Sequence, residues 1–378
     1  MKKFLFILTT GFALFSMFFG AGNLVFPLSL GVNAQGNCLI AGAGFSITAV
    51  LVPLLGFISM MLFDGDFRAF FGMIGKRSGF VLITLILALL CPFGAIPRCI
   101  ALTYASFHEL FPGLSIELFS LIACLVIFGM TIRAKSIISL LGKVLTPLLL
   151  ITLGLILGVG LFSEHTVSLT SENSSALFKG GLVGGYQTLD LLAALFFSAL
   201  LYPALAAYGK EAIPTLALKV SLIAATLLAT TYIGFCYLAQ AHGAHFQGAP
   251  QELVLILLSG HLLGSAGAIV TLILVTLACL TTAIALSAIF AEFVRKDLLQ
   301  EKASYGVSLG ITLVIAYFIA ILSFNGIAAI LAPILVVCYP ALIFLCLVNM
   351  CHKLFGFAYV KSSFFIALFV AVGMAYFS

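Results

Sequence analysis

The stretch FFGAGNLVFP, from Phe18 to Pro27, interrupts an otherwise apolar run between Phe4 and Leu30. Glycine, asparagine and proline all disfavour an α-helix. In hydrocarbon every unpaired backbone group is costly, so a break at this depth must be compensated. We therefore expect a membrane helix that unwinds at residues 19–23 and resumes as a half-helix over residues 24–30. The alternative is a glycine-rich packing face with a proline kink, which is common in membranes.

The composition of the whole chain fits a membrane. Of its 378 residues, 63% are hydrophobic and only 8% are charged, and the mean hydropathy is +1.29. These values exclude a soluble globular domain and predict an all-α polytopic membrane protein with a single membrane domain over residues 1–378. The sequence has no strand pattern of a membrane barrel and no phosphate-binding loop. Its nine cysteines form no metal motif. We expect no cofactor and no nucleic-acid partner, because the net charge of +5 reflects membrane topology.

A window of about 20 residues divides the chain into about eleven predicted spans. They cover residues 5–31, 38–62, 79–106, 116–132, 137–162, 178–208, 214–240, 262–292, 303–323, 326–350 and 358–377. With the amino terminus in the cytoplasm, every Lys and Arg except Arg98 and Lys179 falls on the cytoplasmic side. The positive-inside rule therefore predicts a multi-pass protein of the inner (cytoplasmic) membrane with a cytoplasmic amino terminus.

Span six has the same kind of interruption as span one. Residues 178–205 read FKGGLVGGYQTLDLLAALFFSALLYPAL, in which two glycine pairs precede Gln187, Thr188 and Asp190. Five crossings separate the starts of spans one and six, so the two spans run in opposite directions. Interrupted helices at matching positions of inverted halves indicate the binding site of a secondary transporter. We expect a first five-helix repeat at 1–162, an inverted second repeat at 178–350 and an extra span at 358–378.

Several segments resemble a known family. They are FSMFFGAGNLVFP at 15–27, PFGAIPR at 92–98, GGYQTLDLLAALFF at 184–197, ACLTTAIALSAIFAEF at 278–293 and PILVVCYP at 333–340. Together they resemble the branched-chain amino acid:cation symporter family of the BrnQ type (LIVCS). The resemblance implies uptake of leucine, isoleucine and valine driven by a sodium or proton gradient. It also implies the inverted five-helix repeat of the bacterial leucine transporter (LeuT-like fold), with discontinuous helices 1 and 6. Family members usually have about twelve spans, so this chain is short.

The first break is a candidate seat for an amino-acid carboxylate. A half-helix after the break points the positive end of its dipole at the break, which suits an anion. Glycine lets a ligand approach the backbone closely. The predicted substrate-binding residues here are Phe19, Gly20, Ala21, Gly22 and Asn23. The packing-face alternative remains open on the pattern alone.

Asp190 is the candidate charged group of the second break. A carboxylate at this depth in a span is a functional candidate by default. It is suited to take up a proton, to coordinate a cation or to bind the substrate ammonium. The alternative is that Thr188 or Asp190 caps the half-helix that follows. Gln187 and Tyr186 belong to the same candidate site.

A candidate cation site lies in span eight. Ala278, Thr281 and Thr282 are spaced i, i+3 and i+4, so they share one helix face. A carbonyl beside two hydroxyls offers the oxygen ligands that hard cations prefer. The resemblance to sodium-coupled relatives implies that this face meets span one, where Ser16 and Phe19 supply carbonyls. The alternative is that each threonine bonds a carbonyl of its own helix.

Arg98, late in span three, is the predicted gating residue at the outer vestibule or a partner for Asp190. The alternative is an arginine that snorkels to the interface. We expect the substrate side chain to lie among Phe19, Ile96, Tyr186 and Leu286. The prediction is therefore a monomeric symporter in the lipid bilayer that couples branched-chain amino acids to Na⁺. The alternatives are H⁺-coupled uptake of the same or other small apolar amino acids, a channel, and an intramembrane enzyme. For the enzyme, Asp190 has no evident acidic or histidine partner, so we expect no enzymatic activity.

Overall fold

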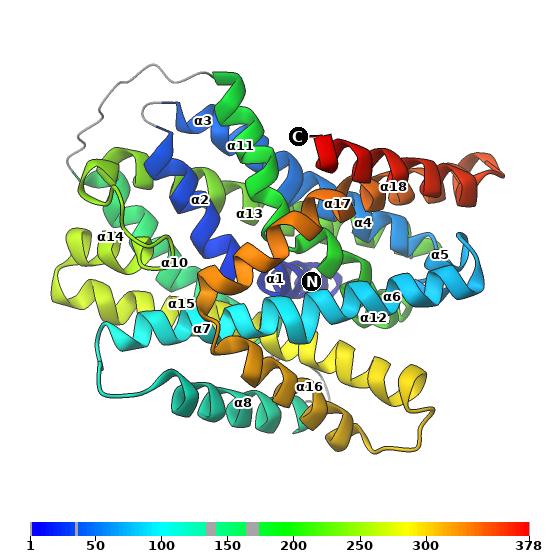
Figure 1. Cartoon of the computed structure of the whole chain (residues 1–378), viewed down its shortest axis with the longest axis horizontal. Coiled ribbons are helices and arrows are strands. Elements are labelled where there is room, and N and C mark those ends of the chain that lie inside the picture. The colour runs from blue at the N-terminus through cyan, green and yellow to red at the C-terminus, as the bar shows by residue number, and fades with distance from the viewer. Residues whose placement is uncertain (1, 35–36, 134–140, 164–173, 378) are drawn as a thin grey trace.

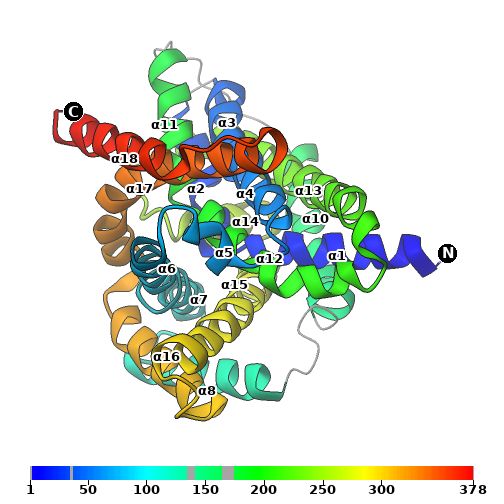
Figure 2. The ribbon, with the colours of Figure 1, turned by 90° about the vertical axis from the view of Figure 1, so that its right-hand side faces the viewer.

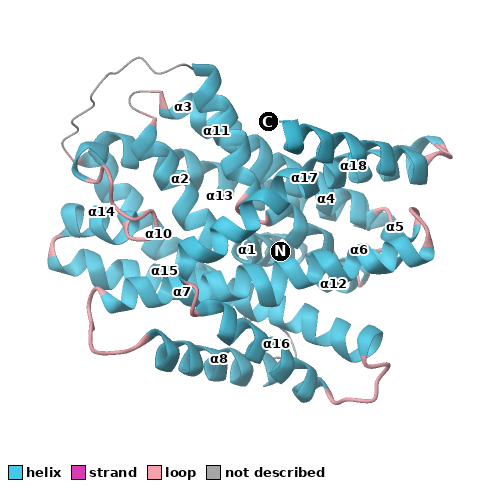
Figure 3. Cartoon of the chain, viewed as in Figure 1, coloured by secondary structure: helices cyan, strands magenta, loops and turns pink. Residues whose placement is uncertain are grey.

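The computed structural model describes residues 2–34, 37–133, 141–163 and 174–377, and this part of the chain is helical with no strand (Figure 3). The bounds of the helices in the first part of the chain are α1 Lys2–Phe18, α2 Ala21–Asn33, α3 Cys38–Ser46, η1 Ile47–Leu51, α4 Val52–Met61, α5 Phe67–Gly72, α6 Lys76–Leu90, η2 Cys91–Ala95, α7 Ile96–His108, α8 Ile116–Arg133, η3 Leu141–Leu145 and α10 Thr146–Phe162. Those that follow are α11 Ser174–Tyr186, α12 Asp190–Ala206, η4 Lys210–Ala212, α13 Ile213–His242, η5 Gly243–His245, α14 Val254–Leu263, α15 Ser265–Phe293, η6 Val294–Leu298, α16 Tyr305–Ala320, α17 Ser323–Phe355 and α18 Val360–Phe377.

The predicted spans correspond to helices of different lengths. Among the described residues, 7 helices are long and apolar enough to cross a membrane, and the bent pair α1–α2 makes 8. The predicted spans at 116–132, 303–323 and 358–377 coincide with the shorter apolar helices α8, α16 and α18. The first residues of the predicted span at 137–162 lie outside the described residues. A polytopic helical membrane protein is confirmed, while the count of eleven spans stays a prediction.

The first predicted break is present and is shorter than expected. Helices α1 and α2 are separated only by Phe19 and Gly20, and their axes bend by 69°. The N–H of Phe19 donates to Phe15 O at 2.9 Å and closes α1. The N–H of Gly20 donates instead to Asn23 Oδ1 at 3.1 Å. Residues 21–23 are therefore the first turn of α2, not unwound chain, because the asparagine side chain caps the new helix from inside.

The second predicted break lies between α11 and α12, at residues 187–189. Each N–H of this short segment bonds the carbonyl three residues earlier, as in a turn. Leu189 has a φ of 66°, in the left-handed region. L-residues rarely adopt this conformation, so it interrupts the helix where it occurs. Helices α11 and α12 still form one membrane-length segment, Ser174–Ala206.

Both breaks lie in the middle of the molecule. Helix α1 enters the bundle from its periphery and ends near the centre (Figure 2). Its second half, including Phe15 and Phe18, is buried against α13, α12 and α15. Helix α18 lies at one edge and packs on α17 (Figure 1). A π-helical segment, η2, contains Pro92 and precedes α7, whose second residue is Pro97. Such a segment redirects a helix locally, and here it ends three residues before Arg98.

Candidate functional site

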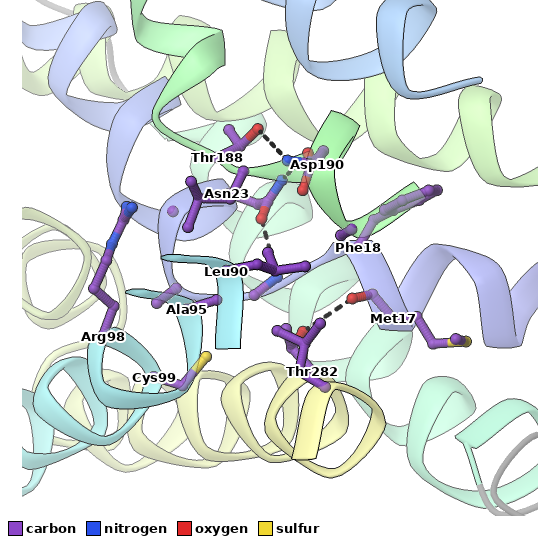
Figure 4. A pocket seen from close by; sticks show the side chains of 16 residues that line it. Met17, Phe18, Asn23, Leu90, Ala95, Arg98, Cys99, Thr188, Asp190 and Thr282 are labelled. Atoms are coloured by element: carbon purple, nitrogen blue, oxygen red, sulfur yellow. Dashed lines mark hydrogen bonds between the residues drawn. The ribbon is translucent and has the colours of Figure 1, made fainter. Parts of the chain in front are cut away.

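A small cavity lies where the two breaks meet. It measures about 20 Å³, which holds about one water molecule. Residues from both breaks and from the helices that enclose them line it: Met17, Phe18, Gly20, Ala21, Gly22, Asn23, Leu90, Ala95, Arg98, Cys99, Thr188, Leu189, Asp190, Ala193, Thr282 and Leu286. Figure 4 shows these side chains converging from helices that are far apart in sequence. The conformation is therefore closed around its polar centre.

Glycine at position 22 lets the two breaks touch. A Cβ there would lie 3.0 Å from Arg98 Nη2 and 3.0 Å from Thr188 Cα. The first-turn N–H groups of α2 have no acceptor within their own helix, and they carry the positive end of its dipole. The break thus combines close backbone packing with the donors that an anion requires. Gly22 therefore fits both alternatives given for the first break: it packs closely against other helices, and it borders the proposed carboxylate site.

The Asp190 carboxylate bonds across to the first break. Asn23 Nδ2 donates to Asp190 Oδ2 at 2.6 Å and also contacts Tyr232 Oη. Tyr232 Oη lies 3.5 Å from the same carboxylate oxygen, at the limit of a hydrogen bond. The idea that the Asp190 side chain caps α12 is wrong, because Asp190 is the first residue of α12 and its carboxylate reaches α2. Thr188 Oγ1 accepts from the Asp190 N–H at 3.4 Å, a long capping contact.

The threonine face of α15 meets the end of α1, as predicted. Thr281 Oγ1 lies 3.0 Å from Ser16 O and 2.8 Å from Ala278 O. Thr282 Oγ1 lies 3.4 Å from Ser16 O and 3.3 Å from Met17 O. The Ser16 carbonyl lacks its usual helical donor, because the Gly20 N–H bonds Asn23 instead. The two threonine hydroxyls have one proton each to donate, and three carbonyl oxygens lie within hydrogen-bond distance of them. The cluster therefore has more acceptor lone pairs than donor protons.

This oxygen cluster includes one carbonyl that was not predicted. Thr282 Oγ1 contacts the Met17 carbonyl, and the Phe19 carbonyl as a cation ligand stays a prediction. The bond from Thr281 to Ala278 is the same-helix bond expected of a structural threonine. Among the described residues no group of three or more His, Cys, Asp and Glu side chains is placed to hold a metal. A cation here would be held by carbonyl and hydroxyl oxygens, the ligands of a hard ion.

Arg98 is buried at the cavity wall. Its side chain is 1% exposed, so the snorkelling alternative is wrong. The guanidinium lies between the rings of Phe26 and Phe324, with its central carbon 5.1 Å and 4.8 Å from their centroids. Nη1 donates to Gln187 O in the second break at 2.8 Å. The structure thus brings Arg98 to the same cavity as Asp190, while the role of Arg98 as a gate stays a prediction.

Some predicted residues lie beside the cavity without lining it. Phe19 is buried and stacks on Phe15 and Tyr232. Ile96 is buried at the start of α7, and the Tyr186 ring packs on Tyr339 at 4.6 Å between centroids. Gln187 does not line the cavity, but its backbone carbonyl accepts the hydrogen bond from Arg98 Nη1. Ala21, Thr188 and Leu286 do line the cavity. Tyr232 was not predicted, and its one signal in the sequence is a tyrosine inside an apolar span. The other lining residues that were not predicted are Met17, Phe18, Leu90, Ala95, Cys99, Leu189 and Ala193.

Two broken helices around a buried polar cavity define a class of fold, the LeuT-like fold, and two solved structures share it. MhsT in complex with L-phenylalanine matches with a TM-score of 0.66 at 16% identity, covering 98% of this chain and 98% of that chain. Mhp1, a nucleobase-cation-symport-1 family transporter in a closed conformation with bromovinylhydantoin bound, matches with a TM-score of 0.61 at 12% identity, covering 98% and 91%. At these identities the likeness shows the fold.

The sequence relatives identify the family. The profile of the family described as branched-chain amino acid transport protein matches residues 4–377. The branched-chain amino acid permease BrnQ of Bacillus subtilis is 31% identical, over 93% of this chain and 82% of that protein. The branched-chain amino acid transport system 3 carrier protein of Pseudomonas aeruginosa is 29% identical, over 91% and 80%. The chain belongs to the branched-chain amino acid transport protein family, a family of transporters and not of enzymes.

Proposed function

We propose that the chain imports leucine, isoleucine and valine together with a sodium ion by alternating access. The protein would act as a monomer in the cytoplasmic membrane, with its amino terminus in the cytoplasm. The observation that carries the choice of sodium is the oxygen cluster between α1 and α15. It contains the carbonyls of Ser16, Met17 and Ala278 and the hydroxyls of Thr281 and Thr282. No group in it can carry a proton at physiological pH.

The position of the cluster supports coupling between ion and substrate. Thr282 lines the cavity between the breaks, so an ion at the cluster would border a bound amino acid. It would also tie α15 to the end of α1, next to the turn of α2 that we propose as the substrate seat. Ion and substrate would then stabilise the same state, and each would raise the affinity of the other by the same factor.

The cavity must widen for an amino acid to enter. At about 20 Å³ it has room for about one water. The substrate polar groups would replace contacts that the two breaks now make with each other, such as the bond from Asn23 to Asp190. The apolar side chain would then lie against lining residues such as Leu90, Ala95 and Leu286. Loading the site therefore separates the breaks, which is the kind of local change that a rocking transporter amplifies.

Radiolabelled leucine uptake into proteoliposomes tests the proposal, with sodium and pH gradients imposed separately. We expect the sodium gradient to drive accumulation and choline to abolish it. Thr282→Val keeps the shape and deletes one oxygen, so it raises the sodium concentration for half-maximal uptake. Thr226→Val is the matched control, because Thr226 lies on an exposed helix face and bonds Leu222 O of its own helix. Unchanged uptake in choline would contradict sodium coupling.

Proton coupling is the second candidate, and the burial of Asp190 favours it. Its side chain is buried within the span and bonded to Asn23. If Asp190 carries the coupling proton, Asp190→Asn removes the pH dependence of uptake while leucine still binds. If Asp190 only binds the substrate ammonium, the variant lowers leucine affinity and leaves the pH dependence unchanged. Loss of the pH dependence, together with uptake in choline, would assign the coupling to Asp190.

A further inference from the structure

Two nitrogen atoms of the Arg98 side chain have no hydrogen-bond acceptor in the described part of the chain. Nη1 bonds Gln187 O, but Nε and Nη2 are buried without a hydrogen-bond partner. A guanidinium always carries its charge and has five donors in a fixed fork. Stacking between two phenylalanine rings compensates part of the charge and leaves these in-plane donors unsatisfied. Buried donors in native proteins are nearly always paired, so a missing acceptor requires an explanation.

Asp190 does not supply that acceptor. It is the other formal charge in the cavity wall, but its carboxylate contacts Asn23 and Tyr232. The ion pairs between described residues, Arg68–Asp297 and those of Glu292 with Arg295 and Lys296, lie elsewhere. The Arg98 guanidinium is thus held by Gln187 O and by the rings of Phe26 and Phe324. The edge of the guanidinium that carries Nε and Nη2 has no partner among the described residues.

The free edge of the fork lies over the start of α2. Arg98 extends from α7 toward the α2 ribbon in Figure 4. Its Nη2 would be 3.0 Å from a Cβ at Gly22, which places it beside the first turn of a helix of 13 residues. The Ala21 amide of that turn is directed at the Cys99 thiol, while the amides of Gly22 and Asn23 have no acceptor in their own helix and carry the positive dipole end. Two independent sets of donors therefore face one small volume.

We propose that Arg98 binds the carboxylate of the transported amino acid, together with the first-turn amides of α2. This rests on the proposed function and gives Arg98 a substrate-binding role where sequence analysis predicted a gate. An arginine fork matches a carboxylate in shape and charge, and pairs with it bidentately. The ammonium group would then lie toward Asp190. A zwitterion fits such a cavity, and a compound lacking the carboxylate leaves the buried guanidinium unsatisfied.

Binding to the full-length chain in lipid nanodiscs tests this with L-leucine and with leucinol, which has a hydroxymethyl group in place of the carboxylate. We expect Arg98→Gln to weaken leucine binding by about tenfold or more, since bonds between charged groups are the strong ones. Leucinol binding should change by less than about twofold. Arg98→Lys keeps the charge without the fork, so its leucine affinity should fall between those of wild type and Arg98→Gln. Arg77→Gln, at an exposed arginine of α6, should change neither.

Equal loss of leucine and leucinol binding in Arg98→Gln would overturn the proposal, because a structural role affects both ligands alike. Should that variant fail to fold, Arg98→Lys decides by the same comparison: a selective loss of leucine supports the proposal and an equal loss overturns it. Leucine binding that requires chloride, tested by replacing chloride with gluconate, would assign the fork to a free anion. A wild type that binds no leucine at all contradicts the proposed function itself.

Discussion

At the scale of single residues, the glycines of the two breaks have different surroundings. Gly181 and Gly185 of α11 pack against α3 and η1, where a Cβ would meet the backbone of Phe45 and the side chain of Thr48. Their pattern in the sequence is that of a packing face. Gly22 instead faces Arg98 and the second break. The same residue type therefore lets two helices pack closely in one case and lets the two breaks meet at the cavity in the other.

Gly22→Ala should reduce uptake by about tenfold. The added Cβ would lie 3.0 Å from both Arg98 Nη2 and Thr188 Cα, so these neighbours must move. Overpacking of this kind costs about 1–3 kcal/mol. Initial rates of leucine uptake measure it, normalised to the inserted protein. Gly42→Ala is the matched control, since its Cβ would meet Cys236 Sγ at an ordinary 3.8 Å. Equal rates in the two variants would show that the breaks do not need this close approach.

At the scale of helices, both breaks were predictable and their details were not. The glycines at 20 and 22, and the cluster at 180–185, mark the correct spans. The exact end of α1 depends on Asn23, whose side chain takes the Gly20 N–H and leaves the Ser16 carbonyl without its usual helical donor. Spacing along one helix cannot show which carbonyl of another helix is left without its donor. That is why the sequence did not indicate the Met17 carbonyl of the oxygen cluster.

The left-handed residue of the second break offers a test of how that break is held. Leu189 has a φ of 66°, which β-branched residues tolerate least. Leu189→Ile should therefore lower the free energy of unfolding by about 1–2 kcal/mol. Leu191→Ile controls for the change of side-chain shape, because Leu191 is equally buried inside α12. Thermal unfolding in detergent compares them, and equal melting temperatures would contradict a specific cost at position 189.

At the scale of the whole molecule, the sequence identified a polytopic helical protein with two interrupted spans. The meeting of α13 with both breaks, through Tyr232, was not predictable, because it depends on how distant helices pack. The division into inverted halves at 1–162 and 178–350, with an added span at 358–378, stays a prediction. The chain covers about four-fifths of the length of BrnQ from Bacillus subtilis.

One ion pair joins two distant parts of the molecule. Arg68 in α5 donates from Nε and Nη2 to Asp297 in η6 at 2.8 Å and 2.7 Å, and these bonds raise the pKa of Arg68. The Arg68 side chain is 51% exposed, so the pair is worth up to about 1 kcal/mol.

We expect Arg68→Glu to lower uptake by about two- to fivefold, and the double change with Asp297→Arg to restore most of it. Arg295→Glu is the control, because Arg295 pairs with Glu292 one turn away and links no distant parts. Failure of the double change to restore uptake would contradict a role for the pair itself.

The small size of the cavity has a consequence for the energy supply of the cell. A carrier that opens to one side at a time must not let its driving ion cross alone, because such a leak would dissipate the gradient that powers it. With about 20 Å³ between the breaks, this cavity has room for about one water molecule and not for a file of water through which an ion could pass. We therefore expect the contact between the two breaks to block the passage of ions through this cavity when no substrate is bound. A planar bilayer containing the protein should show no unitary current without substrate, which also separates this carrier from a channel.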